Sequence, residues 1–218
     1  MRFNFFSKHT ILRTILLIEM SKLKLKGDVL DLGGGERTKY NKYLKKYCLL
    51  LENVNIDPER KPTYSFDLND KNIKFNKKYN YIVSSHTIEH VYNFENILEL
   101  GFNNLKKGGS LILEVPFLYR IHADPFDFTR LTYNYYEKKL EEIGFKEVMV
   151  IPRGFGVFTA SYSMLEPLLR RNILYPLHFF LRFLFISTDI LLCKVSKSYE
   201  KYFGSNAYPL GYKVVAKK

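Results

Sequence analysis

Short apolar runs alternate with amphipathic stretches along the first 150 residues of the chain. The apolar runs have the length and composition of buried strands, and they lie at 29–32, 48–56, 64–68, 79–84, 110–115 and 146–151. The stretches between them have helical spacing, and the clearest lie at 36–47, from about 91 to 105 and at 132–143. Because strands alternate with helices, the pattern predicts an α/β fold with a doubly wound, mostly parallel sheet.

Prolines and glycines mark where the predicted elements end. Pro116 stops the fifth strand, because proline cannot donate a hydrogen bond to a sheet. The pair Gly108 and Gly109 is expected to end the helix before that strand, and Gly144 to end the helix that Thr132 caps. A last apolar run at 211–216 predicts a final strand.

An acid and three glycines separate the first strand from the first helix. Glycine lets the backbone adopt positive φ, and it lets a ligand approach without meeting a Cβ atom. Asp31 would repel a pyrophosphate, but it would attract a ligand that carries hydroxyls or an ammonium group. The sequence from Gly33 to Thr38 is also not the G-x-G-x-x-G of dinucleotide-binding proteins. The turn therefore predicts a ligand other than a nicotinamide dinucleotide.

Two further acids end later strands of the predicted sheet. Asp57 follows Asp31 by 26 residues, close to the ~20 expected for an acid that holds ribose hydroxyls. Asp67 ends the third strand, where it could accept a hydrogen bond from an adenine amino group. Because ligands of open parallel sheets bind outside the carboxyl ends of the strands, the three acids predict one site for an adenosine-containing ligand.

Composition and charge narrow the class of protein. The 218 residues suit one domain with a large core, and 46% hydrophobic residues are typical of a globular chain. A formal charge of +12 favours an anionic partner such as a membrane surface or an acidic glycan. The lysines are scattered and no nucleic-acid motif stands out, so we expect no nucleic-acid partner. Two distant cysteines, Cys48 and Cys193, indicate a reduced cytoplasmic protein.

Five motifs resemble, in order, those of class I S-adenosylmethionine-dependent methyltransferases of the type 11-like kind. They are Val-Leu-Asp-Leu-Gly-Gly-Gly at 29–35, Asn-Ile-Asp-Pro at 55–58, Phe-Asp-Leu at 66–68, Tyr-Asn-Tyr-Ile-Val-Ser-Ser-His-Thr-Ile-Glu-His-Val at 79–91 and Lys-Lys-Gly-Gly-Ser-Leu-Ile-Leu-Glu-Val-Pro at 106–116. The resemblance implies a Rossmann-like seven-stranded sheet whose last strand runs antiparallel beside the sixth. It also implies S-adenosyl-L-methionine as the cofactor.

The resemblance implies a role for each matching position. The first acid and the glycines would hold the amino-acid part of the cofactor, the second acid the ribose, and the third motif the adenine. The end of the fourth strand would line the cofactor. The implied cofactor-binding residues are Asp31, Gly33, Gly34, Gly35, Asp57, Asp67, Leu68, Ser84, Ser85 and His86. The three adjacent glycines depart from the x-Gly-x-Gly that is frequent in the family, so the resemblance does not imply the backbone path of this turn.

A polar loop after the fifth strand holds the best candidate for a general base. Methylation of a hydroxyl needs a base, and histidine is the usual choice near neutral pH. His122 shares this loop with Asp127 and Arg130, so an acid could orient its imidazole for catalysis. The alternative is a network of ion pairs that only orders the loop, and His90 is expected to be structural. No metal is expected, since a site made of His122, Asp124 and Asp127 is the weaker interpretation of these residues.

Residues 153–208 form a long apolar insertion where the family has a short connection before its last strand. His178, Arg182 and Asp189 interrupt it at spacings of 4 and 7, which places them on one helical face. Three interpretations stay open: a lid or homodimer contact, an interfacial helix whose basic ends meet anionic lipid headgroups, and a membrane span, which is the least favoured.

The predicted organisation has four parts. An N-terminal amphipathic helix lies within 1–26, a methyltransferase core at 27–152, the apolar insertion at 153–208 and a last core strand at 209–218. Arg13 and Glu19 interrupt the apolar part of the first segment, so it is not expected to be a signal peptide.

These features predict an S-adenosylmethionine-dependent methyltransferase. The expected reaction is O-methylation of a glycan or lipid-linked small-molecule intermediate, in the cytoplasm at the inner membrane face. The alternative is a non-catalytic scaffold that binds S-adenosylmethionine at a membrane assembly.

Overall fold

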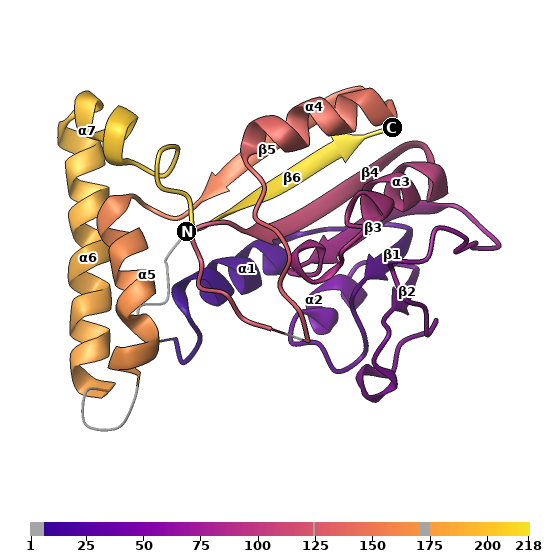
Figure 1. Cartoon of the computed structure of the whole chain (residues 1–218), viewed down its shortest axis with the longest axis horizontal. Coiled ribbons are helices and arrows are strands. Elements are labelled where there is room, and N and C mark those ends of the chain that lie inside the picture. The colour runs from indigo at the N-terminus through magenta and orange to yellow at the C-terminus, as the bar shows by residue number, and fades with distance from the viewer. Residues whose placement is uncertain (1–6, 124, 171–174) are drawn as a thin grey trace. The chain divides into compact units, whose positions relative to one another are not determined.

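The computed structural model describes residues 7–123, 125–170 and 175–218, which form two compact units. The sheet unit comprises Leu17–Val115, Ile121–Ile151 and Lys213–Lys218. Within the described residues, the helical unit comprises 7–16, Pro116–Arg120, 152–170 and 175–212, so it joins residues 7–16 to the apolar insertion. Figure 1 shows the elements of both units along the chain.

The sheet has six strands within the described residues, in the order β2-β1-β3-β4-β6-β5. Their bounds are Asp28–Leu32 (β1), Leu50–Val54 (β2), Tyr79–Ser85 (β3), Leu105–Pro116 (β4), Glu147–Arg153 (β5) and Gly211–Lys217 (β6). β1 pairs in parallel with β2 and β3, and β3 pairs in parallel with β4. β6 lies between β4 and β5, antiparallel to both, so the predicted Rossmann-like sheet with an antiparallel last strand is confirmed.

The prediction that 64–68 forms the third strand was wrong, so the sheet has six strands within the described part of the chain and not the seven that were expected. Tyr64 makes only an isolated bridge to Val54, and the chain then leaves the sheet. The Asp67 carboxylate accepts hydrogen bonds from the backbone N–H and the side-chain amide of Asn69, both at 2.9 Å. This local turn replaces the pairing that a strand would need.

The first crossover helix is also shorter than the predicted 36–47. α2 covers only Asn41–Lys45. Thr38 Oγ1 and Asn41 Nδ2 both donate to the carbonyl of Gly35, at 2.9 and 3.2 Å. Side chains that bond to nearby backbone groups compete with a helix, so residues 36–40 remain turns.

Two glycines predicted to end a helix lie inside a strand instead. α3 covers Glu95–Asn104, and β4 begins at the next residue. The Gly108 N–H donates to the carbonyl of Lys218, and the Lys218 N–H donates to the carbonyl of Gly109, each at 3.0 Å. Pairing with the end of the chain therefore extends β4 through both glycines.

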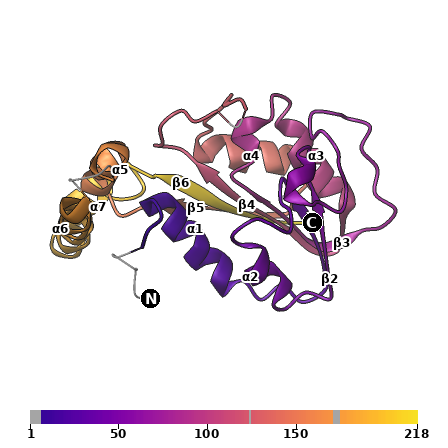
Figure 2. The same ribbon diagram turned by 90° about the horizontal axis from the view of Figure 1, so that it is seen from below.

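The later helix of the sheet unit was predicted within one residue. α4 covers Tyr133–Ile143 and follows Thr132, although the Thr132 side chain makes no capping hydrogen bond. Gly144 has φ 114°, and its N–H donates to the carbonyls of Leu140 and Glu141, as expected of a glycine cap. In Figure 2, α3 and α4 cover one face of the sheet and α2 lies on the other. The buried central strands therefore expose neither face, as is usual for parallel sheets.

The helical unit contains the start of α1 (Ile11–Lys22) together with α5 (Val157–Leu169), α6 (Tyr175–Val195) and α7 (Lys197–Phe203). One apolar cluster joins them, and it consists of Ile11, Leu12, Ile15, Ala160, Tyr162, Leu169, Ile186 and Leu210. Among the described residues, α6 is the one helix with the length and composition to cross a membrane, a property that core helices of soluble proteins share.

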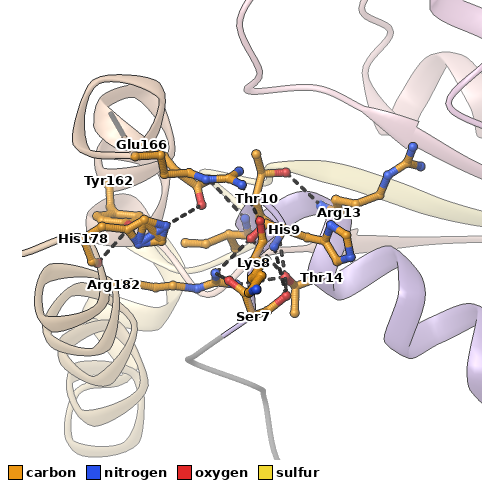
Figure 3. Close-up of polar contacts among 12 residues, drawn as sticks. Ser7, Lys8, His9, Thr10, Arg13, Thr14, Tyr162, Glu166, His178 and Arg182 are labelled. Carbon is orange, nitrogen blue, oxygen red and sulfur yellow. Dashed lines mark hydrogen bonds and ion pairs between the residues drawn. The ribbon is translucent and has the colours of Figure 1, made fainter. Parts of the chain in front are cut away.

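Three polar residues of α6 face the interior of the helical unit. His178, Arg182 and Asp189 are all buried, which confirms the predicted shared face. Arg182 donates to the carbonyls of Ser7 and His9 at 3.0 and 2.9 Å, and to Thr14 Oγ1 at 2.9 Å (Figure 3). The segment before α1 is therefore held by a guanidinium group from α6.

Two acids complete this buried network, one near each end of α5. Glu166 Oε2 accepts a hydrogen bond from the Ile11 N–H at 3.1 Å, and burial raises the pKa of its carboxyl. Asp189 accepts from the Thr159 N–H at 2.7 Å and from the Tyr199 hydroxyl at 2.7 Å. Each acid satisfies a helix N–H that lacks an intrahelical partner.

Candidate functional site

The three glycines after β1 form a turn with no room for side chains. A Cβ atom at Gly33 would lie 2.1 Å from Thr87 Oγ1, and φ there is 89°. A Cβ at Gly34 would lie 1.8 Å from Asp31 Oδ2, and one at Gly35 would lie 2.4 Å from the backbone carbonyl oxygen of Arg60. All three positions therefore need glycine, as the sequence predicted for a turn that lets a ligand approach the backbone.

Asn55 holds this turn in place. Its side-chain amide donates to the carbonyl oxygens of Gly33 and Gly34, at 2.8 and 3.0 Å. The Gly33 N–H in turn donates to the carbonyl of Val54 at the end of β2, at 2.8 Å. Sequence reasoning gave Asn55 no role, although the residue lies within one of the five motifs.

Asp31 is fully buried at the carboxyl end of β1. Burial raises the pKa of its carboxyl to about 7. The Tyr40 hydroxyl donates to Oδ1 at 3.3 Å, whereas Oδ2 has no hydrogen-bond partner among the described residues. An acid in this state favours a ligand that brings a donor or a positive charge.

Ser84 and Ser85 end the neighbouring strand, β3. Both residues are buried, and neither hydroxyl has a hydrogen-bond partner within the described part of the chain. Because β1 and β3 pair in parallel, with Leu32 opposite Ser84, these hydroxyls and Asp31 belong to the same edge of the sheet. Buried polar groups without partners are rare in proteins, and their concentration here fits a polar ligand.

His86 follows directly in a strained conformation. Its φ is 50°, which is uncommon for a residue with a side chain. The His86 N–H donates to the carbonyl of Glu114 at 2.8 Å, so the turn is tied to β4. Strain of this kind is characteristic of functional sites.

The two other predicted acids lie nearer the surface. Asp57 is about half exposed, and its carboxylate caps η1 (Pro58–Arg60) by accepting from the Glu59 N–H at 2.9 Å. The η1 turn packs on the glycine turn through Arg60, so Asp57 lies close to it in the fold. Asp67 is exposed, while Leu68 is buried and its carbonyl accepts from the Asn96 amide at 2.8 Å.

The loop after β4 brings three predicted residues together. Asp127 Oδ2 accepts a hydrogen bond from the His122 N–H at 2.9 Å and lies 3.4 Å from Nδ1 of the same residue. The Arg130 guanidinium donates to both oxygens of Asp127, and these bonds hold the pKa of that carboxyl at about 2. His122 is thus oriented by an ionised acid, as general-base catalysis would need. Asp124 lies outside the described residues.

Sequence reasoning missed a buried glutamate beside this loop. Glu89, in η2 (Ile88–His90), is 1% exposed, and burial raises the pKa of its carboxyl to about 7. Neither carboxylate oxygen has a hydrogen-bond partner among the residues that the structure describes. His90 Nε2 lies 3.7 Å from Glu89 Oε1, and the rings of His90 and His122 are 5.0 Å apart. The adjacent Glu-His pair after a buried strand was the available signal.

Comparison with known proteins agrees with this geometry. A sequence profile of the family described as "Methyltransferase domain" matches residues 7–148, more than half of the chain. No curated protein sequence matches the chain.

Several solved structures share the fold at low sequence identity. A SAM-dependent methyltransferase from Archaeoglobus fulgidus has a TM-score of 0.58 at 17% identity, over 94% of this chain and 91% of its own. One from Mesorhizobium loti has a TM-score of 0.56 at 13% identity, over 95% and 98% of the two chains. Phosphoethanolamine N-methyltransferase 2 from Haemonchus contortus, in complex with S-adenosyl-L-methionine, has a TM-score of 0.55 at 14% identity; the match covers 94% of this chain and 51% of that one.

The family match agrees with the buried acid and glycine turn at the end of β1 and with the antiparallel strand inserted before the sheet edge. The chain therefore belongs to the methyltransferase domain family, and its sheet has the Rossmann-like fold of the S-adenosylmethionine-dependent enzymes.

Proposed function

We propose that this protein uses S-adenosyl-L-methionine to methylate a hydroxyl group of a glycan or lipid-linked small molecule. The observation that carries the proposal is a set of three buried oxygen atoms, Asp31 Oδ2 and the hydroxyls of Ser84 and Ser85, that have no hydrogen-bond partner among the described residues. They lie beside a glycine turn with no room for a Cβ atom. A ligand with an ammonium group and hydroxyls would satisfy these groups.

Different residues of the sheet unit would bind the different parts of the cofactor. Asp31 and the Gly33–Gly35 turn would hold its amino-acid part, and Asp57 its ribose hydroxyls. Asp67 and Leu68 would border the adenine, and Ser84 to His86 would line the remaining wall. When bound, the cofactor supplies an electrophilic methyl group, so the protein has mainly to position the acceptor.

The loop at His122 supports a hydroxyl acceptor. A hydroxyl must lose its proton as it is methylated, and the imidazole of His122 would accept that proton. Asp127 would hold the ring and stabilise its protonated form, and Arg130 would keep Asp127 ionised. These are the roles of base, orienting acid and supporting cation.

The outer surface of the helical unit supports an acceptor at a membrane. Since the polar face of α6 is buried, its opposite face is apolar and exposed, and so is part of α5. The exposed apolar residues are Phe158, Met164, Leu165, Leu168, Leu177, Phe180, Phe183, Leu184, Leu191 and Val195, and we refer to them as the hairpin surface.

The charges beside the hairpin surface favour anionic lipid. Lys194, Lys197 and Lys201 are exposed at the end of α6 and on α7, where they outnumber one exposed acid, Glu200. The acids Glu166 and Asp189 are buried. An apolar face next to lysines is the arrangement of helices that lie in a membrane interface. These features support our proposal that the enzyme acts at the cytoplasmic face of the inner membrane.

The test has two stages. Titration of the purified protein with S-adenosylhomocysteine by calorimetry should give one saturable site that Asp31→Ala and Asp57→Ala weaken. Incubation with methyl-labelled cofactor and fractions of a cell extract should then label the glycolipid fraction.

Absence of binding would overturn the proposal, and binding without labelling of any fraction would support the non-catalytic scaffold instead. Labelling of a protein or nucleic-acid fraction would contradict the proposed acceptor.

A further inference from the structure

Three side chains of the sheet unit converge on one point beside the proposed acceptor site. Glu89, His90 and His122 can each offer one ligand atom, and the three atoms lie within 4.8 Å of one another. They come from two segments that are joined by a hydrogen bond of 2.7 Å from the Phe128 N–H to the carbonyl of Glu89. This hydrogen bond holds the loop that contains His122 against η2, which follows β3.

The glutamate is the unusual member of this group. Its side chain is 1% exposed, and neither oxygen has a hydrogen-bond partner in the described part of the chain. A buried carboxylate normally binds donors or a metal ion, because the loss of hydration is otherwise uncompensated. His90 Nε2 and His86 Nδ1 lie 3.7 and 3.9 Å from its Oε1, too far for hydrogen bonds.

Both histidines have an oxygen atom near their Nδ1, which can fix the orientation of the ring. His90 Nδ1 lies 2.6 Å from the carbonyl oxygen of Phe126, and His122 Nδ1 lies 3.4 Å from Asp127 Oδ2. In His90 the other ring nitrogen, Nε2, is the one that lies near Glu89. Histidines that bind metals almost always donate their second ring N–H to a carbonyl or a carboxylate, which fixes the tautomer.

We propose that Glu89, His90 and His122 bind a divalent transition-metal ion, with one carboxylate oxygen and two imidazole nitrogens as ligands. Two histidines and one carboxylate are a frequent ligand set for zinc and related ions, and such sites keep positions open for water or substrate. The nearby cation Arg130 is already bound to Asp127. His90 and His122 are 14% and 26% exposed, so an ion can reach the site from solvent.

This inference rests on the proposed function for its role, and it changes one part of that function, the group that activates the acceptor hydroxyl. A bound cation would attract the acceptor oxygen and lower the pKa of its hydroxyl, so the proton could leave to solvent. His122 would then be a ligand, and the cation would replace it as the group that activates the acceptor. The site differs from the sequence-based alternative of His122, Asp124 and Asp127, since Glu89 and His90 take the place of the two aspartates.

Direct metal binding tests the site without any enzyme assay. The chelator-treated full-length protein should bind one Zn²⁺ per chain in calorimetry, and Co²⁺ should give the visible absorption of a nitrogen-ligated site. Glu89→Gln and His122→Ala should each weaken Zn²⁺ binding at least tenfold. Glu141→Gln, which removes an exposed carboxylate from α4, should leave it unchanged.

Titration of the same samples with S-adenosylhomocysteine separates the possible failures. Unchanged affinity in Glu89→Gln would show that the variant is folded, so a loss of Zn²⁺ binding would support the metal site. Zn²⁺ binding that is absent in the wild type, or equal in Glu89→Gln, would overturn the site and leave the proposed function intact. Failure of the wild type to bind S-adenosylhomocysteine would overturn the proposed function, whatever the result with Zn²⁺.

Discussion

The carboxylate of Asp31 fills the space that a Cβ atom at Gly34 would need, since that atom would come within 1.8 Å of Asp31 Oδ2. The acid and the glycine therefore require each other. A larger residue at 34 would push the acid out of its buried position, where it ends β1 and faces the proposed cofactor site.

Gly34→Ala should destabilise the protein and abolish cofactor binding. Overpacking of this kind costs about 1–3 kcal/mol, and the displaced Asp31 carboxylate could no longer face an ammonium group. Urea unfolding and calorimetry with S-adenosylhomocysteine measure the two effects. In the double variant with Asp31→Ala, stability should partly recover while binding stays absent. A double variant no more stable than Gly34→Ala would contradict this relationship.

Binding of S-adenosylhomocysteine should weaken as the pH falls below about 7. The pKa of Asp31 is raised to about 7 by burial, so the empty site holds a proton at lower pH. An ammonium group favours the ionised acid, and binding then has to displace that proton, which costs up to tenfold in affinity per pH unit. Calorimetry from pH 6 to 8 would show the slope, and Asp31→Asn should remove it. An equal slope in that variant would assign the effect to other groups.

The raised pKa of Asp31 has the opposite effect on the stability of the protein without cofactor. The folded state binds the Asp31 proton more tightly than the unfolded state does, so this contribution is fully present below about pH 4. It should be lost as the pH rises through 7.

The positions of most strands along the chain and of the glycine turn could be predicted because both depend on local sequence, whereas the antiparallel last strand was implied by the family resemblance. Apolar runs and turn residues carry that signal without reference to distant parts of the chain. The strand at 64–68 could not be excluded in this way, since the turn made by Asp67 and Asn69 competes with it. Glu89 was missed for another reason: its environment depends on a loop that begins some thirty residues later.

In α6, too, the sequence predicted local features but not contacts with distant parts of the chain. Spacing alone placed His178, Arg182 and Asp189 on one face. Their partners could not be predicted, because Ser7 and Thr14 lie more than 160 residues away in sequence.

Asp127→Asn should lower kcat more than it raises KM. Asp127 is 3% exposed and positions His122 through both its backbone N–H and its ring, so its loss would misorient the imidazole. We expect a decrease in kcat of about 10- to 100-fold, typical for the loss of a residue that orients a functional histidine. Steady-state kinetics and S-adenosylhomocysteine titration would separate this effect from misfolding. An unchanged kcat would assign Asp127 and Arg130 to loop ordering alone.

The hairpin surface should bind vesicles that contain anionic lipid. Phe180→Ser with Phe183→Ser should reduce sedimentation with phosphatidylglycerol vesicles severalfold, because both side chains are more than half exposed on the outer face of α6. Leu49→Ser removes an even more exposed apolar side chain from the sheet unit and serves as the control. Binding should also fall with added salt, since the lysines contribute.

An alternative use of this surface gives a different result. If the hairpin surface joins two copies of the chain, the wild type should sediment as a dimer without vesicles. The double phenylalanine variant should then be a monomer.

Arg182→Met should destabilise the protein strongly. The change leaves the carbonyls of Ser7 and His9 and the Thr14 hydroxyl without their buried donor. The expected loss in the free energy of unfolding is at least about 3 kcal/mol. Urea unfolding would measure it, with Arg37→Met at an exposed position as the control. A loss below 1 kcal/mol, in the range of exposed pairs, would show that these bonds are replaced by water.

The bonds between Arg182 and the segment before α1 also set an order of events during synthesis. Residues 7–14 leave the ribosome long before residue 182 is made, a delay on the order of 10–30 s at typical rates of translation. Ile11 and Leu12, which are buried in the finished protein, have no α5 or α6 to cover them during this time. The helical unit therefore contains residues that are made early, yet it can close only after α5 and α6 have been made.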